Sequence, residues 1–121
     1  MDRKTTISEL KEKIKKFCED RDWNQFHGGK NLATALIIEA AELLEHFRWK
    51  SEKEANKLFE NVKKKEEIED EIADIFYFLL RLAQRYDIDL SEVLERKLKK
   101  NVKRYPVEKA RGTNKKYTEL R

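Results

Sequence analysis

The sequence predicts an all-α fold, and three observations support this prediction. The chain of 121 residues contains only three Gly and one Pro, fewer breaks than a many-turned β fold requires. Its apolar residues recur at helical spacing over long segments. Two capping boxes, each a Thr or Ser followed three residues later by a Glu, begin at Thr6 and Ser51. The simplest architecture is a bundle of four main helices in a single domain over residues 1–121.

The first half of the chain is expected to contain two long helices and one short segment. The first helix begins after Thr6 and ends near Asp20, and an aromatic loop with a Gly-Gly break follows it. The second helix extends from Asn31 to about Trp49. It is apolar nearly all round, which is typical of a helix buried on most sides. Ser51 then begins a short helix or turn segment.

Two further long helices are expected in the second half. One extends from Glu66 to about Tyr86, with charged residues in its first turns and apolar residues later. Ser91 can cap the next helix, which ends before Pro106 because proline cannot continue a helix. The tail, residues 108–121, is polar and basic with little periodicity.

Composition limits the classes of function. The net charge of +4 arises from 28 basic and 24 acidic residues, so the surface is mixed and argues against a nucleic-acid partner. No segment approaches the ~20 apolar residues that cross a membrane, so no membrane partner is expected. The single Cys18 fits a reducing environment, and a cytoplasmic location is expected. Because the core of one such chain is thin, a homodimer or homotetramer is expected.

Two pairs of carboxylates lie in apolar stretches where a helix would bury them. Glu39 and Glu42 are three residues apart in the most apolar helix, so they share one face. Glu71 and Asp74 repeat this spacing in the later helix. Unpaired buried carboxylates are costly and repel one another, so a cation should compensate them. If the two helices pack antiparallel, the four acids converge on a hard dication, Mg²⁺ or alternatively Mn²⁺.

The same acids permit other interpretations. A single acid pair usually faces solvent or pairs with Lys or Arg, but two pairs in apolar surroundings on separate helices favour a metal. Glu45 and Glu67 each lie one turn from a proposed ligand, and either could be solvated or act on a water. Glu45 projects near the acid face and is the candidate for orienting the water. The catalytic candidates are therefore Glu45 and Glu39.

The acids belong to a longer pattern of motifs. Glu39-x-x-Glu42 is followed, after 28 intervening residues, by Glu71-x-x-Asp74. Further motifs are Arg21-Asp22-Trp23-Asn24-Gln25-Phe26-His27, Phe47-Arg48-Trp49, Lys97-x-x-x-Asn101-x-x-Arg104-Tyr105-Pro106 and Lys115-Lys116-Tyr117-Thr118-Glu119-Leu120. Over about residues 7–120 the sequence resembles the MazG-like all-α nucleotide pyrophosphohydrolases, and among them the dCTP pyrophosphatase branch.

This resemblance implies an enzyme that hydrolyses (deoxy)nucleoside triphosphates to monophosphate and pyrophosphate, with water attacking the α-phosphorus. It implies Mg²⁺ bound by the four acids and a role in sanitation of the nucleotide pool. It also implies assembly as a dimer or a dimer of dimers, with sites formed between subunits and the base held by aromatic residues. A carboxylate near the attacking water can accept its proton.

The resemblance also gives candidates for substrate binding. Trp23 and Trp49 are candidates for stacking on the base, although packing in a core is the alternative for both. The full set is Phe17, Trp23, His27, Trp49, Phe78, Lys97, Asn101, Arg104, Lys115, Lys116 and Tyr117. The tail residues 115–117 could close over the phosphates. From the residues alone, the basic members of the set would be interpreted as solvated surface.

Two departures from the family pattern affect the expected specificity. Ile14 lies where the vertebrate dCTP-preferring members have a histidine, and Phe78 replaces a tyrosine. Because an apolar site discriminates weakly between bases, we expect a preference for dCTP or a related pyrimidine without strict cytosine selection. Two other classes stay open: a non-catalytic helical bundle that binds or regulates a protein partner, and a bundle that binds nucleic acid through its basic fourth helix and tail.

Overall fold

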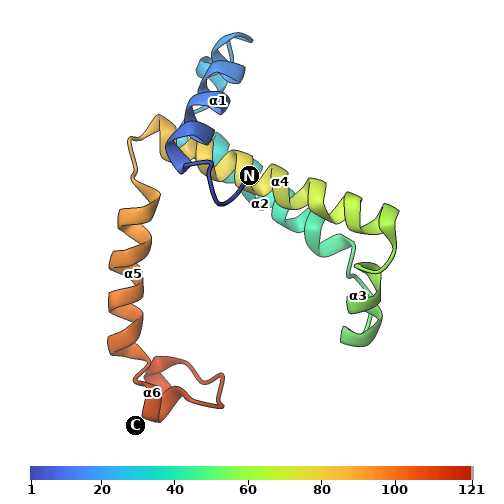
Figure 1. Cartoon of the computed structure of the whole chain (residues 1–121), viewed down its shortest axis with the longest axis vertical. Coiled ribbons are helices and arrows are strands. Elements are labelled where there is room, and N and C mark those ends of the chain that lie inside the picture. The colour runs from blue at the N-terminus through green and yellow to red at the C-terminus, as the bar shows by residue number, and fades with distance from the viewer. Residues whose placement is uncertain (121) are drawn as a thin grey trace. The chain divides into compact units, whose positions relative to one another are not determined.

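A computed structural model describes residues 1–120 and divides the chain into two compact units, Met1–Asp87 and Ile88–Arg121. The helices of the first unit are α1 (Ile7–Glu19), the 3₁₀ turn η1 (Asn24–Phe26), α2 (Gly29–Glu45), α3 (Glu52–Leu58) and α4 (Val62–Arg85). The second unit contains α5 (Leu90–Arg104), α6 (Val107–Ala110) and the 3₁₀ turn η2 (Tyr117–Glu119). Residues 1–120 contain no strand, so the all-α prediction is confirmed (Figure 1).

The first unit is built on an antiparallel pair formed by α2 and α4, which lie side by side in Figure 1. At one end of the pair, the Gly29 backbone N–H donates to the Tyr86 hydroxyl at 2.6 Å. At the other end, His46 Nε2 lies 3.7 Å from Glu71 Oε1. The antiparallel arrangement assumed from the sequence is therefore present, and it places Glu71 of α4 opposite Glu39 and Glu42 of α2.

Local capping explains where the helices begin, and most of the predicted starts are close. The capping boxes at Thr6 and Ser51 are both formed. Helix α4 begins four residues earlier than predicted because Asn61 accepts a hydrogen bond from the Lys64 N–H at 3.0 Å. The predicted cap of α5 at Ser91 is wrong, since Asp89 accepts from the Glu92 N–H at 2.9 Å and starts the helix earlier.

The structure corrects the predicted end of α2 and adds detail to the tail. Helix α2 ends at Glu45, before the predicted end at Trp49, because a 3₁₀-like turn follows and Trp49 itself is left-handed with φ of 63°. The tail, for which the sequence showed only little periodicity, contains α6 and η2 between Pro106 and Leu120. These are short single turns that a periodicity search does not detect.

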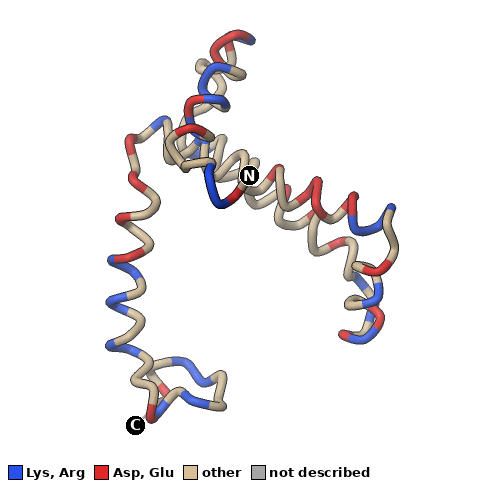
Figure 2. The backbone as a smooth tube through the Cα atoms, viewed as in Figure 1, with Lys and Arg blue, Asp and Glu red and all other residues tan. Residues whose placement is uncertain are grey.

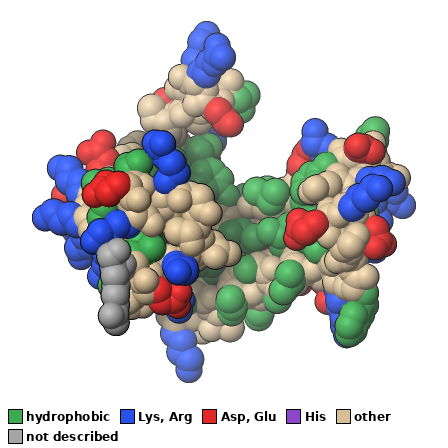
Figure 3. Space-filling model, turned by 90° about the horizontal axis from the view of Figure 1, so that it is seen from below, with side chains coloured by type: hydrophobic (Ala, Val, Ile, Leu, Met, Phe, Trp, Pro, Cys, Tyr) green, Lys and Arg blue, Asp and Glu red, His purple; other side chains and the backbone are tan. Residues whose placement is uncertain are grey.

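Helix α2 is less buried than its composition predicts. Only Leu32 is fully buried, while Ile37, Ile38 and Leu44 are 66%, 51% and 68% exposed. Hydrophobic side chains accordingly cover the surface of the α2–α4 region in Figure 3. For one copy of the chain, the prediction of burial on most sides is wrong, because α4 covers only one side of α2.

None of the helices in residues 1–120 has the length and apolar character needed to cross a membrane.

Candidate metal and nucleotide site

Three carboxylates meet between α2 and α4. Glu39 and Glu42 lie one turn apart on α2, and Glu71 faces them from α4, with one oxygen of each side chain within 4.8 Å of the other two. Figure 2 shows acidic residues gathered on the first half of α4, beside the end of α2. Three negative charges at this separation repel strongly unless a cation or protons neutralise them.

Two of these oxygens are enclosed without a hydrogen-bond partner. They are Oε2 of Glu39 and Oε2 of Glu71, the only such side-chain atoms within residues 1–120. A buried carboxylate oxygen without a donor costs far more than a paired one. An all-oxygen donor set with unused lone pairs is what hard dications such as Mg²⁺ and Mn²⁺ bind. The residues therefore fit a bound dication.

The crowding of carboxylates also changes the pKa of Glu39. Its burial, followed by the neighbouring carboxylates of Glu42, Asp74 and Glu71, raises the pKa of Glu39 to about 7. A cation in the cluster would act in the opposite direction and favour the ionised form. A metal ion that binds to this cluster would therefore release the proton of Glu39.

Asp74 stands apart from this group. Its carboxylate is exposed and lies outside the three oxygens within 4.8 Å, although it is near enough to raise the pKa of Glu39. The structure therefore brings together three of the four predicted ligands. Asp74 as the fourth ligand stays a prediction.

A pocket of about 510 Å³ opens beside the cluster, between α2, α3 and the first turns of α4. Its lining includes Glu45, the candidate for orienting water, whose carboxylate also lies 3.3 Å from Arg48 Nη1. The full lining is Glu42, Glu45, His46, Lys50, Leu58, Lys64 and Glu71. The two lysines and His46 could not be predicted as site residues from the sequence, because their proximity to the acids depends on the turn into α3 and on the start of α4.

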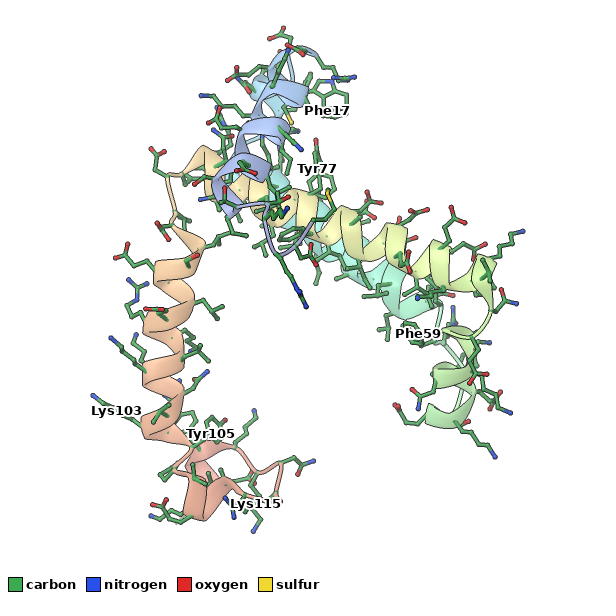
Figure 4. The ribbon with its side chains drawn as sticks, in the orientation of Figure 1. Phe17, Phe59, Tyr77, Lys103, Tyr105 and Lys115 are labelled. Carbon is green, nitrogen blue, oxygen red and sulfur yellow. The ribbon has the colours of Figure 1, made fainter. Side chains whose placement is uncertain are left out.

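Aromatic residues gather where α1 and the loop after it pack against α4. The Phe17 ring centroid lies 5.6 Å from that of Trp23 and 6.1 Å from that of Tyr77, and Figure 4 shows Phe17 and Tyr77 close together. Phe17 and Tyr77 also line an apolar groove of about 280 Å³ together with Lys13 and Ile14. Three of its four lining residues are apolar or aromatic, which agrees with the predicted loss of a polar group at Ile14.

Two predicted base-pocket residues lie beside this cluster. The His27 ring centroid is 6.2 Å from that of Trp23, and Phe78 lies 4.9 Å from Tyr77. Arg81, a residue that the sequence analysis did not consider, is fully buried and donates a hydrogen bond from Nε to His27 Nδ1 at 2.9 Å. An Arg inside an apolar run is the signal that could have identified it, since the same reasoning found the acids.

Trp49 is remote from the aromatic cluster. It follows the C-terminal end of α2, is 87% exposed and contacts the Arg48 guanidinium at 5.0 Å. Trp23 precedes the N-terminal end of the same helix. At 1.5 Å per residue, the 17 residues of α2 separate the two ends by roughly 25 Å. The two tryptophans of one chain therefore cannot stack on the same base.

The other predicted substrate contacts belong to the second unit. Lys97, Asn101 and Arg104 are spaced along α5 so that they share one face. The Arg104 guanidinium lies 4.6 Å from the Tyr117 ring centroid, and Tyr117 packs edge-on against Tyr105 at 6.1 Å. Figure 4 labels Tyr105 and Lys115 in this unit. Lys115 and Lys116 are exposed, and their role in binding stays a prediction.

Comparison with known proteins identifies the class of protein. The model of the MazG-like family matches residues 34–120, which include all four acids, so the chain belongs to the MazG-like family. The family predicted from the sequence is confirmed.

Individual relatives agree with this assignment. The chain is 36% identical to dCTP pyrophosphatase 1 of Rattus norvegicus and of Bos taurus, over 115 residues that cover 95% of this chain and 68% of each relative. The Homo sapiens protein of the same name is 35% identical over the same length. Among solved structures, a pyrophosphatase from Archaeoglobus fulgidus is 40% identical with a TM-score of 0.78, covering 83% of this chain and 92% of the archaeal one.

Proposed function

We propose that this chain hydrolyses (deoxy)nucleoside triphosphates to the monophosphate and pyrophosphate, using Mg²⁺ held by Glu39, Glu42, Glu71 and Asp74. Its family and its relatives, which are named as pyrophosphatases, place it among the nucleotide pyrophosphohydrolases. The observation that carries the metal assignment is the pair of enclosed carboxylate oxygens, Glu39 Oε2 and Glu71 Oε2, that have no partner. A bound dication would neutralise this cluster and stabilise negative charge on the phosphate oxygens.

The proposed chemistry uses the pocket beside the acids. A water attacks the α-phosphorus, the bond from that phosphorus to the bridging oxygen breaks, and pyrophosphate leaves. Glu45 lines the pocket together with Glu42 and Glu71 and is exposed, so we propose that its carboxylate accepts the proton of the water. Lys50 and Lys64 line the same pocket and are suited to hold the departing pyrophosphate oxygens.

The aromatic cluster is the proposed base site. The aromatic rings of Phe17 and Trp23 lie together on the first unit. Stacking of a nucleobase on such a ring contributes roughly 1–3 kcal/mol to the free energy of binding. The adjoining groove is lined by Ile14, Phe17 and Tyr77 and offers too few polar groups to select strictly for cytosine. We therefore propose a preference for dCTP or a related pyrimidine, with tolerance for modified bases.

Two features support a site completed by a second copy of the chain. The apolar residues Ile37, Ile38 and Leu44 lie exposed on α2, and a face of this kind is typical of a subunit interface. Trp23 precedes the N-terminal end of α2 and Trp49 follows its C-terminal end, and the helix is roughly 25 Å long, so both can serve one base only if they come from different copies. A homodimer, alone or paired into a tetramer, satisfies both observations.

The second unit is proposed to contribute to the same domain. The family match extends over residues 34–120 and so includes parts of both units. Lys97, Asn101 and Arg104 on α5, with Tyr117 beside Arg104, offer cationic and polar groups of the kind that bind phosphate or sugar. We propose that Lys115 and Lys116 close over the triphosphate.

The test is a panel of canonical and modified (d)NTPs incubated with Mg²⁺ and analysed by chromatography. The proposal expects pyrophosphate and monophosphate in equal amounts, no orthophosphate, and loss of turnover on addition of EDTA. Glu39→Gln should abolish turnover, whereas Glu69→Gln on the same acidic region, where Glu69 pairs with Lys65 at 3.7 Å, should not. Unchanged turnover in Glu39→Gln, or release of orthophosphate, would refute it.

The exposed apolar face of α2 also favours a second candidate, a non-catalytic bundle that binds a partner protein. This candidate expects no shift of the melting temperature with Mg²⁺, since the acids would then have no role in metal binding. A nucleic-acid-binding bundle would instead show steep salt dependence of binding.

A further inference from the structure

Arg81 is enclosed in the first unit without a carboxylate partner. Its side chain is 0% exposed, and its three hydrogen-bond acceptors are neutral: His27 Nδ1, Gln84 Oε1 and Asn24 Oδ1. None of the salt bridges within residues 1–120 includes it. An enclosed charge of this kind costs stability relative to an apolar residue of similar size. Its retention therefore points to a role in placing its partners.

The direction of one hydrogen bond fixes the chemical state of His27. The Arg81 guanidinium has only N–H groups and keeps its proton at all relevant pH, so its Nε can only donate. Nδ1 of His27, at 2.9 Å, must therefore accept and cannot carry a proton. A neutral imidazole with a bare Nδ1 carries its proton on Nε2.

A second arginine supports this state. Arg85 Nε donates to the His27 backbone carbonyl at 3.3 Å, so two cations lie beside the same residue. Burial, followed by the charges of Arg81 and then Arg85, lowers the pKa of His27. The imidazolium form is disfavoured, and His27 remains neutral.

The same arrangement leaves Nε2 available. No residue of the described chain, 1–120, accepts a hydrogen bond from it, and it is not among the enclosed atoms that lack a partner. The ring lies 6.2 Å from the Trp23 ring, and Arg81 also holds the loop between them through Asn24. The loop therefore presents an aromatic surface and, next to it, one N–H of fixed orientation.

We propose that Arg81 is a positioning residue that holds His27 as the Nε2-protonated tautomer, so that His27 donates one hydrogen bond to an acceptor atom of the nucleobase beside Trp23. This inference rests on the proposed function, because it assumes that the base binds at the aromatic cluster. The site would then recognise a hydrogen-bond acceptor on the base. This recognition would depend on Arg81, which does not touch the base.

The first measurement needs neither nucleotide nor activity. Nitrogen-15 NMR of the imidazole groups distinguishes the two tautomers, and with only two histidines in the chain, His27→Phe assigns the signals. Wild-type protein should show an unprotonated Nδ1 and a protonated Nε2. Arg81→Met should show averaged signals of both tautomers. Gln84→Met, which removes a different Arg81 partner, should keep the wild-type pattern.

The second measurement separates base recognition from chemistry. With the best nucleotide of the panel, Arg81→Met and His27→Phe should each raise KM about ten-fold and change kcat by less than about two-fold. The double variant should show no further rise, because both changes remove the same hydrogen bond. With 2-deoxyribose 5-triphosphate, which has no base, all variants should equal the wild type. Arg81→Lys, which can still donate one bond, should recover part of the loss.

Several outcomes would overturn the proposal. They are a proton on Nδ1 of His27 in the wild type, an unchanged tautomer in Arg81→Met, or an equal rise of KM for the base-free substrate. If Arg81→Met does not fold, as judged by circular dichroism, the wild-type tautomer and the base dependence of His27→Phe decide the question alone. Failure of the proposed function is distinct, since wild-type protein would then release no pyrophosphate whatever the tautomer.

Discussion

At one end of the α2–α4 pair, carboxylate oxygens of Glu39 and Glu71 are enclosed with no donor. At the other end, the enclosed guanidinium of Arg81 finds neutral acceptors on His27, Gln84 and Asn24. Both ends bury a charged group, yet within residues 1–120 only the acid end leaves enclosed side-chain atoms without a hydrogen-bond partner. Since an enclosed carboxylate oxygen without a donor is costly, the acid end fits the dication proposed above, whereas the arginine end satisfies its guanidinium with acceptors of the same chain.

The largest expected effect is at the acid end. Glu71→Gln removes one of the two unpartnered charges and should lower kcat/KM by about 10²–10³-fold, because transition-state charge would lose its metal. Activity with a dNTP and Mg²⁺, measured as pyrophosphate release, checks this. Glu69→Gln is the matched control, and an effect of equal size there would show that the loss is general to acids on α4.

Metal binding and pH should act together on the stability of the acid end. Saturating Mg²⁺ at about 100 times its Kd should raise the melting temperature by about 10 °C at pH 7.5. Without metal, the raised pKa of Glu39, about 7, means that the folded state holds a proton the unfolded state has lost. The contribution of Glu39 to stability should therefore fall as pH rises from about 4.5 to about 7, whereas the lowered pKa of His27 acts in the opposite direction. The melting temperature of metal-free wild type relative to Glu39→Gln should fall across this range, and a difference that stays constant or rises would contradict the assignment.

At the aromatic end, the expected effect concerns binding. Trp23→Ala should raise KM for the preferred dNTP about ten-fold with little change in kcat, since stacking on an aromatic ring contributes roughly 1–3 kcal/mol. It should leave the metal-induced rise in melting temperature unchanged, because Trp23 packs on Phe17 and His27 rather than on the acids. Titration of Mg²⁺ by calorimetry or melting checks the second part, and loss of the metal response would contradict the separation of the two ends.

The comparison also shows what could be predicted from the sequence. The acids were found because Glu39 and Glu71 stand inside apolar helical patterns, where a local rule is broken. The capping boxes at Thr6 and Ser51 were found because their signals are confined to four residues. Such features need no knowledge of which segments meet in space.

Other features depended on tertiary contacts and could not be predicted in this way. Lys50 and Lys64 reach the acid pocket only because α3 turns the chain back onto α4. The exposure of Ile37 and Leu44 could not be predicted either, because periodicity shows that a face is apolar without showing whether the same chain covers it. The second unit illustrates a third case, in which a single-turn helix such as Val107–Ala110 is too short to produce a periodic pattern.

The smallest expected effect concerns the hydrogen bond that joins the start of α2 to the end of α4. The Tyr86 hydroxyl accepts the Gly29 N–H at 2.6 Å, at a helix start that has no side-chain cap of its own. Because Tyr86 is 54% exposed, water can replace part of this bond, and Tyr86→Phe should lower the free energy of unfolding by about 0.5–1 kcal/mol. Denaturant unfolding with and without Mg²⁺ measures this. Tyr105→Phe in the second unit, where the ring contact with Tyr117 is retained, is the control and should change little.

The loss in Tyr86→Phe should be the same with and without Mg²⁺, since the bond lies at the end of the α2–α4 pair remote from the acids. A loss that grows with Mg²⁺ would mean that the two ends are energetically coupled through α2.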